Sequence, residues 1–187
     1  VFYRLFPRLF KNLESYRLWK NRQIAANDCS TLVTDVPPLS EISFKPTDTP
    51  LVSIIIPIYG KIEYTVRCLC SIYKNVKCCD FEVIVVNDCS PDKSAEVLSE
   101  VEGLRLLSNE ENLGFVATCN FGASRAKGRY LCFLNNDTFI CKDWLRNLVW
   151  TIENIKQVGI VGSLLLYPTG LLQESGGVIW SDGTGLN

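Results

Sequence analysis

The stretch LVSIIIPIY, residues 51–59, is followed along the chain by a second apolar run, FEVIVV, at residues 81–86. Both runs are short, rich in β-branched residues and apolar at consecutive positions, which is typical of strands buried on both faces of a sheet. Between them, residues 61–76 carry apolar side chains at helical spacing. A strand, a helix and a second strand in this order predict a parallel pair joined by a crossover helix.

The same alternation continues toward the C-terminus. The apolar patterns predict further helices over 94–101, 115–126 and 143–155, and further strands over 104–107, 129–134 and 158–166. Strands that alternate with helices and are apolar on both faces indicate an α/β fold, with a mostly parallel sheet and helices on both of its faces. We therefore place one main domain at residues 51–187.

The N-terminal residues have a different character. Residues 1–25 hold six lysines or arginines and one acid, and apolar side chains recur at helical spacing over 2–19. We expect residues 1–34 to form a helical extension, which either docks on a membrane surface or a partner, or packs on a protein domain. Residues 35–50, DVPPLSEISFKPTDTP, contain four prolines and predict a linker or a loop that wraps the domain surface.

Composition narrows the functional classes. The chain has 187 residues, 47% of them hydrophobic, and a formal net charge of -1, which argues against a general nucleic-acid-binding protein. Histidine is absent and the nine cysteines form no C-x-x-C pair, so a zinc site is not expected. Cysteines inside apolar runs are typical of reduced, buried thiols, and no run reaches the ~20 apolar residues of a membrane span. We expect a cytoplasmic protein, with residues 1–25 as the segment for peripheral contact with the inner face of the membrane or with another domain.

Polar residues follow the predicted strands at the edge where parallel sheets bind ligands, beyond the carboxyl ends of the strands. Asp88 comes directly after the second strand, where its carboxylate could accept an N–H from a ligand base, or could close a turn and cap the helix at Ser94. Asn135, Asn136 and Asp137 follow the fourth strand. Their oxygens suit Mg²⁺ or Mn²⁺ bound to phosphates, and an ordinary Asn- and Asp-rich turn explains the same residues.

Three common nucleotide and hydrolase motifs are missing. Neither G-x-G-x-x-G nor G-x-x-x-x-G-K-[ST] follows the first strand, which disfavours nicotinamide-dependent and P-loop enzymes. G-x-S-x-G is absent as well, which together with the lack of histidine excludes a serine–histidine hydrolase. The pattern Tyr59-Gly60-Lys61 is too sparse for the glycine- and lysine-rich loop of a nucleotidyltransferase.

Four ordered blocks resemble one known family. They are VSIIIPIYG at 52–60, FEVIVVNDCSPD at 81–92, ENLGFVATCNFGASRAKGRYLCFLNNDTFI at 111–140 and LLYPTGLLQESGGVIWSDGTG at 165–185. They are similar to family 2 glycosyltransferases, in the branch of the rhamnosyltransferases and related sugar transferases of polysaccharide assembly. The resemblance covers residues 51–187 and implies the GT-A fold, a Rossmann-like nucleotide-binding α/β sandwich. It also implies transfer of a sugar from a UDP- or dTDP-linked donor to a saccharide or lipid-linked acceptor, with inversion.

The resemblance carries roles to individual residues. Pro57 and Tyr59 match the pocket of the uracil or thymine base, and Asp88 matches the aspartate that binds the base N3–H. Asp92 matches a second acid of the same loop. The segment that lies against the nucleotide and the sugar corresponds to Asn112, Gly114 and Asn120.

The family's metal and acceptor positions also have counterparts. Asn135, Asn136 and Asp137 stand at the D-x-D position, with Asp137 as the expected ligand of Mg²⁺ or Mn²⁺ and Asn135 in place of the first aspartate. This replacement leaves one fewer carboxylate for the ion. The sugar or acceptor side of the cleft matches Trp144, Glu174, Gly176 and Gly177.

The family's reaction needs two catalytic parts. A divalent ion held by Asp137 would neutralise the charge that develops on the departing nucleoside diphosphate. An Asp or Glu base would deprotonate the acceptor hydroxyl on the opposite side, which gives inversion in one step. In this family the base follows well after the D-x-D position, and we expect it beyond Asn187; Glu174 and Asp182 are the late acids of this chain.

The ends of the chain bear on that expectation. The sequence starts at Val1 and contains no methionine, so we expect a piece of a longer protein. Two hypotheses follow: an inverting glycosyltransferase or its donor-binding half, and a non-catalytic glycosyltransferase-like module that binds nucleotide sugars.

Overall fold

The computed structural model describes residues 38–167, 171–174, 178–179 and 185–186. The chain divides into two compact units, Val36–Val161 and a second that combines Val1–Asp35 with Gly162–Asn187. The helical extension predicted for residues 1–34 lies outside the described residues. Among the helices of the described part, none is long and apolar enough to span a bilayer.

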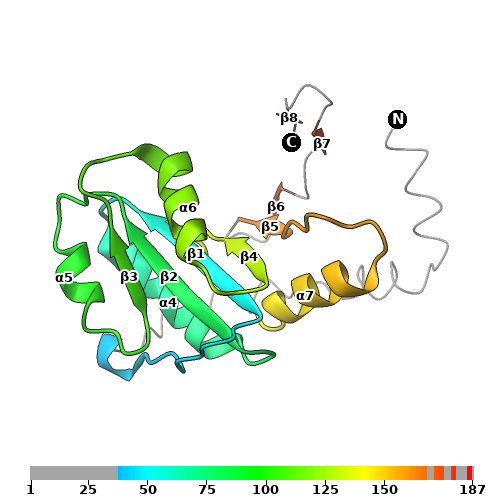
Figure 1. The fold of residues 1–187 in the computed structure, drawn as a ribbon, viewed down its shortest axis with the longest axis horizontal. Helices are drawn as coiled ribbons and strands as arrows, with labels where there is room; N and C mark the ends of the chain where they lie inside the picture. Colours follow the sequence, from blue (N-terminus) through cyan, green and yellow to red (C-terminus); the bar gives the residue numbers. More distant parts are fainter. Residues whose placement is uncertain (1–37, 168–170, 175–177, 180–184, 187) are drawn as a thin grey trace. The chain divides into compact units, whose positions relative to one another are not determined.

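The first unit is built on a four-stranded parallel sheet (Figure 1). Its strands are β1 (Val52–Ile58), β2 (Phe81–Asn87), β3 (Arg105–Ser108) and β4 (Tyr130–Phe133). They lie in the order β3-β2-β1-β4, and each neighbouring pair is parallel. The four strands predicted from the apolar runs are confirmed, and the two most apolar runs occupy the centre of the sheet.

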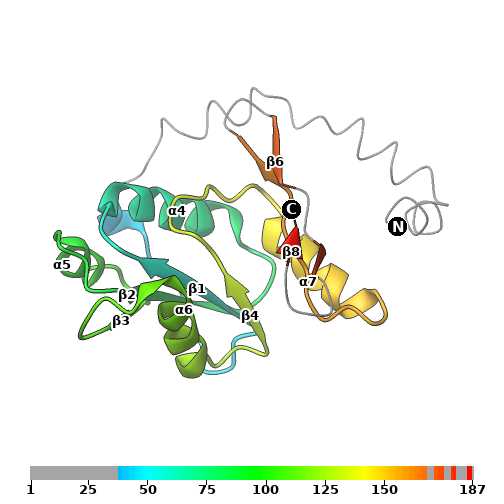
Figure 2. The ribbon, with the colours of Figure 1, turned by 90° about the horizontal axis from the view of Figure 1, so that it is seen from above.

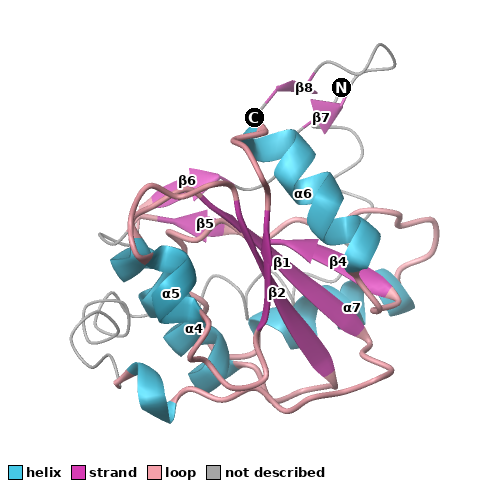
Figure 3. Cartoon of the chain, turned by 60° about the vertical axis from the view of Figure 1, so that its left-hand side comes forward, coloured by secondary structure: helices cyan, strands magenta, loops and turns pink. Residues whose placement is uncertain are grey.

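Helices cover both faces of this sheet, as predicted. They are α4 (Ile62–Asn75), α5 (Ser94–Leu98), α6 (Gly114–Arg125) and α7 (Trp144–Asn154), with a short 3₁₀ turn at Leu39–Glu41 before β1. Figure 2 shows α4 and α6 on opposite sides of the strands, and Figure 3 shows α5 on the side of α4. This parallel sandwich is the GT-A architecture expected from the sequence.

Alternation along β1 explains the two layers of core. Ile54 and Ile56 point to one face, where they join a cluster with Leu69 and other buried residues of α4. Ile55 points to the other face and packs with Phe121 of α6. Because β1 is covered on both sides, its residues 54–56 are all fully buried, and a polar residue at any of them would lose its hydration.

A glycine lets α6 approach the sheet closely. A Cβ atom on Gly122 would lie 2.6 Å from Cγ2 of Ile55 and 2.9 Å from Cγ2 of Val86, which is closer than carbon atoms pack. Gly122 therefore allows α6 to pack directly on β1 and β2.

The proline-rich segment before β1 wraps the domain and contributes to its core. Ile42 and Phe44 are buried, and the Phe44 N–H donates to the carbonyl of Glu102 at 2.9 Å. Gly103 has a φ of +74°, and a Cβ there would lie 1.8 Å from the Phe44 carbonyl oxygen. The segment thus closes the side of the domain near the turn that precedes β3.

The prediction of a fifth long strand over 158–166 is wrong. Only Leu165–Leu166 is extended, as β5, and it pairs antiparallel with β6 (Leu172–Glu174) in a separate two-stranded sheet. Gly159 and Gly162 interrupt the apolar run, and glycine weakens strands because it loses more backbone freedom and packs no side chain. Ile160 is 83% exposed, so this run does not form a buried strand. A second small ribbon pairs β7 (Val178–Ile179) with β8 (Gly185–Leu186).

A buried acid ties the strands together at the amino end of the sheet. Glu82 accepts hydrogen bonds from the Ser53 hydroxyl at 2.5 Å and from the Lys127 N–H at 2.7 Å, and it pairs with the guanidinium of Arg105. The Gly128 N–H in turn donates to the Ser53 hydroxyl at 2.8 Å. This network joins β1, β2 and β3 to the α6–β4 turn, at the edge opposite the predicted ligand site.

Candidate functional site

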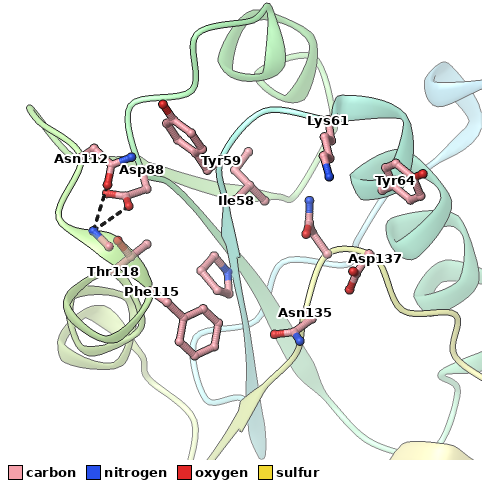
Figure 4. Close-up of a pocket in the computed structure, with 13 residues that line it drawn as sticks. Ile58, Tyr59, Lys61, Tyr64, Asp88, Asn112, Phe115, Thr118, Asn135 and Asp137 are labelled. Carbon is pink, nitrogen blue, oxygen red and sulfur yellow. Dashed lines mark hydrogen bonds between the residues drawn. The ribbon is translucent and has the colours of Figure 1, made fainter. Parts of the chain in front are cut away.

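A cavity of about 650 Å³ opens at the carboxyl edge of the parallel sheet (Figure 4). This volume is typical of small-molecule sites. The cavity is lined by Pro57, Ile58, Tyr59, Lys61, Tyr64, Asp88, Asn112, Gly114, Phe115, Thr118, Asn135, Asn136 and Asp137. All of these residues belong to the first unit.

The strand order sets the distance between the two acids of the cavity. Asp88 follows β2, Asp137 follows β4, and β1 runs between these strands. Two strand spacings of about 4.8 Å each separate the strand ends by roughly 10 Å. Figure 4 accordingly shows Asp88 and Asp137 on opposite sides of the cavity, with Ile58 and Tyr59 of the β1 end between them. The two acids therefore stand on opposite sides of the cavity.

Pro57 lines the cavity at a position where β1 needs no N–H on that side. The Ile55 carbonyl accepts from the Leu134 N–H at 2.9 Å, and β4 pairs with β1 no further than Ile55. Pro57 lies two residues later, so its backbone faces the same side, past the end of β4. Proline is tolerated there because no ladder hydrogen bond is lost. The overhang of β1 beyond β4 thus forms one wall of the cavity.

Asp88 is the most heavily bonded side chain of the site. Its Oδ1 accepts from Asn109 Nδ2 at 2.7 Å and from the Leu113 N–H at 2.8 Å, and its Oδ2 accepts from the Gly114 N–H at 2.9 Å. Asp88 is 5% exposed. It therefore holds the loop before α6 and the first residues of that helix against the end of β2.

These hydrogen bonds keep Asp88 ionised. Burial alone would raise the pKa of the carboxyl group, but the donors of Asn109, Leu113, Thr118 and Gly114 outweigh it, and the pKa lies below its ordinary value. A carboxylate has about four acceptor positions. Asn109 and Leu113 take two positions on Oδ1, and Gly114 takes one on Oδ2. The Thr118 hydroxyl also lowers the pKa of this carboxyl group, so a ligand at the cavity wall would share Oδ2 with Thr118.

The sequence left two roles open for Asp88, and the structure adds a third. Asp92, and not Asp88, accepts from the Ser94 N–H at 3.0 Å and from the Ser94 hydroxyl, so Asp92 caps α5. Asp88 instead caps α6 at Gly114. The capping partner is 26 residues away along the chain, which is why local spacing did not reveal it.

The turn after β4 is anchored on α4. Asn136 Nδ2 donates to the hydroxyl of Thr65 at 3.0 Å, and the Cys68 thiol donates to the Asn135 carbonyl at 3.8 Å. Burial raises the pKa of the Cys68 thiol to about 12, so the thiol stays protonated and remains a donor. Thr138 closes the turn by donating from its hydroxyl to the same Asn135 carbonyl at 2.7 Å. Asp137 is therefore presented on a fixed turn, with its side chain exposed at the cavity.

The donor set at this turn fits a divalent cation that is shared with a ligand. Asp137 supplies one carboxylate, and the amides of Asn135 and Asn136 supply neutral oxygens, which Mg²⁺ and Mn²⁺ accept. No cluster of three or more acidic, cysteine or histidine side chains occurs in the described part of the chain. One carboxylate does not hold such an ion firmly, so phosphate oxygens of a bound nucleotide would have to complete its shell.

Most of the predicted nucleotide-binding residues meet in this cavity. Pro57, Tyr59, Asp88, Asn112, Gly114, Asn135 and Asn136 all line it, together with Asp137. Asn120 is exposed on α6 and Asp92 lies at the start of α5, and neither is among the lining residues. Trp144 is the first residue of α7 and packs against the core. Glu174 lies on β6 of the second unit, whereas Gly176 and Gly177 lie outside the described residues.

Five lining residues were not predicted from the sequence. They are Ile58, Lys61, Tyr64, Phe115 and Thr118. Helical spacing could have pointed to Thr118, because it stands four residues after Gly114 on the same face of α6. It could also have pointed to Tyr64, which lies in the first turn of α4.

The comparison with family profiles decides the family. The family model described as "Glycosyl transferase family 2" matches residues 53–177, which is more than half of the chain. The chain belongs to glycosyl transferase family 2. The match begins in β1, and every residue that lines the cavity falls within the matched range.

Two relatives of this family 2 chain are a glycosyltransferase and an O-antigen biosynthesis protein. Glycosyltransferase GlyA of Streptococcus pneumoniae serotype 4 is 35% identical over 104 residues, which are 52% of this chain and 14% of GlyA. The O-antigen biosynthesis protein RfbC of Myxococcus xanthus is 29% identical over 168 residues, which are 87% of this chain and 13% of RfbC. The chain thus spans about one seventh of the length of each of these relatives.

Solved structures support the GT-A fold. The mannosyltransferase PcManGT of Pyrobaculum calidifontis, solved with GDP-Man and Mn²⁺, superposes with a TM-score of 0.53 at 22% identity. The superposition covers 73% of this chain and 41% of PcManGT.

Proposed function

We propose that this family 2 glycosyltransferase domain binds a UDP- or dTDP-linked sugar in the cavity between Asp88 and Asp137, for transfer with inversion to a saccharide or lipid-linked acceptor. The observation that carries the proposal is that the two acids line one cavity from strand ends separated by β1. Such a span suits a nucleoside diphosphate, with its base at one end and its phosphates at the other. The similarity to RfbC, an O-antigen biosynthesis protein, supports an acceptor in polysaccharide assembly.

The base end of the proposed complex rests on Asp88. Uracil and thymine present an N3–H donor, and Oδ2 of Asp88, which accepts from Gly114 and lies near the Thr118 hydroxyl, is the acceptor that we expect to meet it at the cavity wall. The exposed ring of Tyr59 lies beside it and offers an aromatic face for the base. Since Asp88 is held ionised, it accepts and does not donate, which favours a base with N3–H over cytosine.

The phosphate end rests on the turn at Asp137. A Mg²⁺ or Mn²⁺ ion bound there together with the diphosphate would supply Lewis-acid stabilisation of the departing phosphate. The chain's own residues fix the geometry: α4 holds the turn through Thr65 and Cys68, so the Asp137 carboxylate is presented without reorganisation. We assign no base for the acceptor hydroxyl among the described residues.

Base recognition is tested on the unaltered protein, because changing Asp88 also disturbs the fold. We expect N3-methyl-UDP and CDP to bind at least about tenfold more weakly than UDP, the size of one lost charge-assisted hydrogen bond. Calorimetry with the 187-residue chain measures this directly, and dTDP and GDP complete the series. Equal affinity for UDP and N3-methyl-UDP would show that Asp88 does not read N3–H. If none of these nucleotides bound, the proposed function itself would fail.

The metal role of Asp137 gives a second prediction. We expect Mn²⁺ to tighten UDP binding by about tenfold or more in the wild type and to have little effect in Asp137→Asn, because the amide removes the ion's one charged protein ligand. Titrations in Mn²⁺ and in chelator measure the difference. Asp143→Asn is the matched control, since this acid at the start of α7 pairs with Arg146 at 3.1 Å and does not line the cavity. An equal response to Mn²⁺ in wild type and Asp137→Asn would rule out this metal site.

A further inference from the structure

One basic side chain reaches the cavity. Of the described residues that line it, Lys61 alone carries a lysine or arginine side chain. It directly precedes α4, after β1, so the strand order places it between the end at Asp88 and the end at Asp137. Figure 4 shows Lys61 on the side of the cavity away from Asp88, together with Asp137.

The backbone at Lys61 has a conformation that lysine rarely adopts. Its φ and ψ are 56° and 50°, in the left-handed region, directly after Gly60 with a φ of 67°. Glycine adopts this conformation more easily because it has no Cβ to approach the following carbonyl, and asparagine or aspartate does so because its short polar side chain can hydrogen-bond locally. Residues held in such regions cluster at binding and active sites. The loop therefore accepts strain while it presents a long cationic side chain to the cavity.

Two contacts from the β2–α5 loop hold this conformation. The Gly60 N–H donates to the Ser90 hydroxyl at 2.8 Å. Bonding to Ser94 contributes most to keeping the pKa of Asp92 low, burial opposes it, and the N–H groups of Lys61 and Ile62 add to the lowering. Asp92 Oδ2 also lies 3.5 Å from the position that a Cβ on Gly60 would take, so this carboxylate stands at the N-terminus of α4 and compensates the positive end of that helix. An anion in the cavity would have to find its positive charge elsewhere.

The ammonium group of Lys61 is available for that purpose. None of the ion pairs found in the described part of the chain involves it. Among the described residues its ring contact is with Tyr64, at 5.9 Å from Nζ to the ring centroid, a weak interaction for an exposed cation. Asp137, on the same side, would repel a diphosphate, so a cation is needed there in any case.

We infer that Lys61 binds the diphosphate of the nucleotide sugar and gives the site affinity for it that does not depend on a metal ion. The inference rests on the proposed function and deepens it, because it names a residue of this chain that recognises the phosphate part of the donor. With Asn135 at the turn, a metal ion has one fewer carboxylate to hold it. Lys61 would supply positive charge for the diphosphate from the protein itself.

The test compares three ligands that differ only in phosphate. In chelator, we expect Lys61→Gln to bind uridine as the wild type does, and to bind UMP and UDP more weakly, with a loss for UDP of about tenfold. Ligand-observed NMR suits the weak ligands and calorimetry suits UDP. The loss should shrink as salt is raised, because the contact is between exposed charges.

Lys77→Gln is the matched control. Lys77 follows the other end of α4, about 20 Å away at 1.5 Å per residue. Like Lys61 it is exposed and contacts a tyrosine ring, Tyr73, with Nζ 4.8 Å from the centroid. Its replacement should leave the affinity for all three ligands unchanged. A Lys61→Gln variant that binds UDP as tightly as the wild type would overturn the inference, and so would an equal loss for uridine and UDP.

Lys61→Gly separates binding from folding. Glycine fits the left-handed backbone, so this variant should melt at or above the temperature of Lys61→Gln while showing the same loss of UDP affinity. A UDP affinity restored to the wild-type level by glycine would mean that backbone geometry, not the ammonium, determines binding. If the wild type binds no nucleoside diphosphate at all, the proposed function fails; if it binds UDP and the Lys61 variants match it, only this inference fails.

Discussion

An Asp88→Ala variant should lose about 3–5 kcal/mol of unfolding free energy and all measurable nucleotide binding. The change removes the acceptor of three hydrogen bonds and leaves the N–H groups of Leu113 and Gly114 and the amide of Asn109 without it. Each buried donor left unsatisfied costs about 1–3 kcal/mol, and partial access to water in the cavity reduces the sum. Urea denaturation at neutral pH measures the loss.

Low pH should reduce the contribution of Asp88 to the free energy of unfolding, because the pKa of Asp88 is lowered in the folded state. Because the folded-state pKa of Asp88 lies below the unfolded value of about 3.9, its stabilisation is fully present above pH 4 and is lost as the pH falls through the folded pKa. Asp88→Asn keeps one acceptor oxygen and has no charge to lose. The stability difference between wild type and Asp88→Asn should therefore be larger at pH 7 than at pH 3. A difference that stayed constant, or an Asp88→Ala variant as stable as wild type, would contradict this role.

Glu82 lies at the edge of the sheet opposite the cavity, so its removal should lower the stability of the fold without changing the affinity for UDP. We expect Glu82→Ala to lose about 2–4 kcal/mol, because Ser53 and the Lys127 N–H lose a buried partner and the Arg105 guanidinium loses its counter-charge. The value is below that of a fully buried pair, since the Arg105 side chain is 34% exposed. Where the variant is folded, its affinity for UDP should equal that of the wild type, because the network lies at the amino ends of the strands.

Chemical denaturation and calorimetry on the same samples test both halves of this prediction. Burial opposes ionisation of Glu82, but its donors outweigh burial and lower the pKa, so this contribution too is lost only as the pH falls through the folded pKa. Glu82→Gln keeps the shape and an acceptor, and should be less destabilised than Glu82→Ala. A loss of UDP affinity in folded Glu82→Ala would mean that the two edges of the sheet are coupled.

The central sheet could be predicted from sequence because its strands are uninterrupted apolar runs. The run at 158–166 has a similar composition, yet its two glycines and its position after Gln157, with a φ of 64°, prevent a strand there. The contribution of Ile42 and Phe44 to the core was beyond prediction for another reason. Two apolar residues in a proline-rich segment are too few to establish a period, and their burial depends on Gly103, about 60 residues later.

The location of the candidate site at the carboxyl edge of the sheet could be predicted from the sequence, but most contacts within it could not. Polar residues after β1, β2 and β4 meet because the strands are parallel, and the sequence is enough to infer that. The partners of Asp88 come from the loop before α6, and the sequence does not say how this loop folds back onto β2. Lys61 was not predicted as a site residue because a single lysine after a strand forms no recognisable motif. Its left-handed backbone conformation is known only from the structure.

The uneven bonding of the cavity wall has a consequence for how such a domain can change over generations. Asp88 holds the loop before α6, so a substitution there destabilises the fold as well as changing specificity. Tyr59, Asn112 and Phe115 line the same cavity with exposed side chains, and changes among them should leave the fold intact. New donor preferences would then arise around a fixed aspartate, and a library built for altered specificity should vary those three positions and leave residue 88 alone.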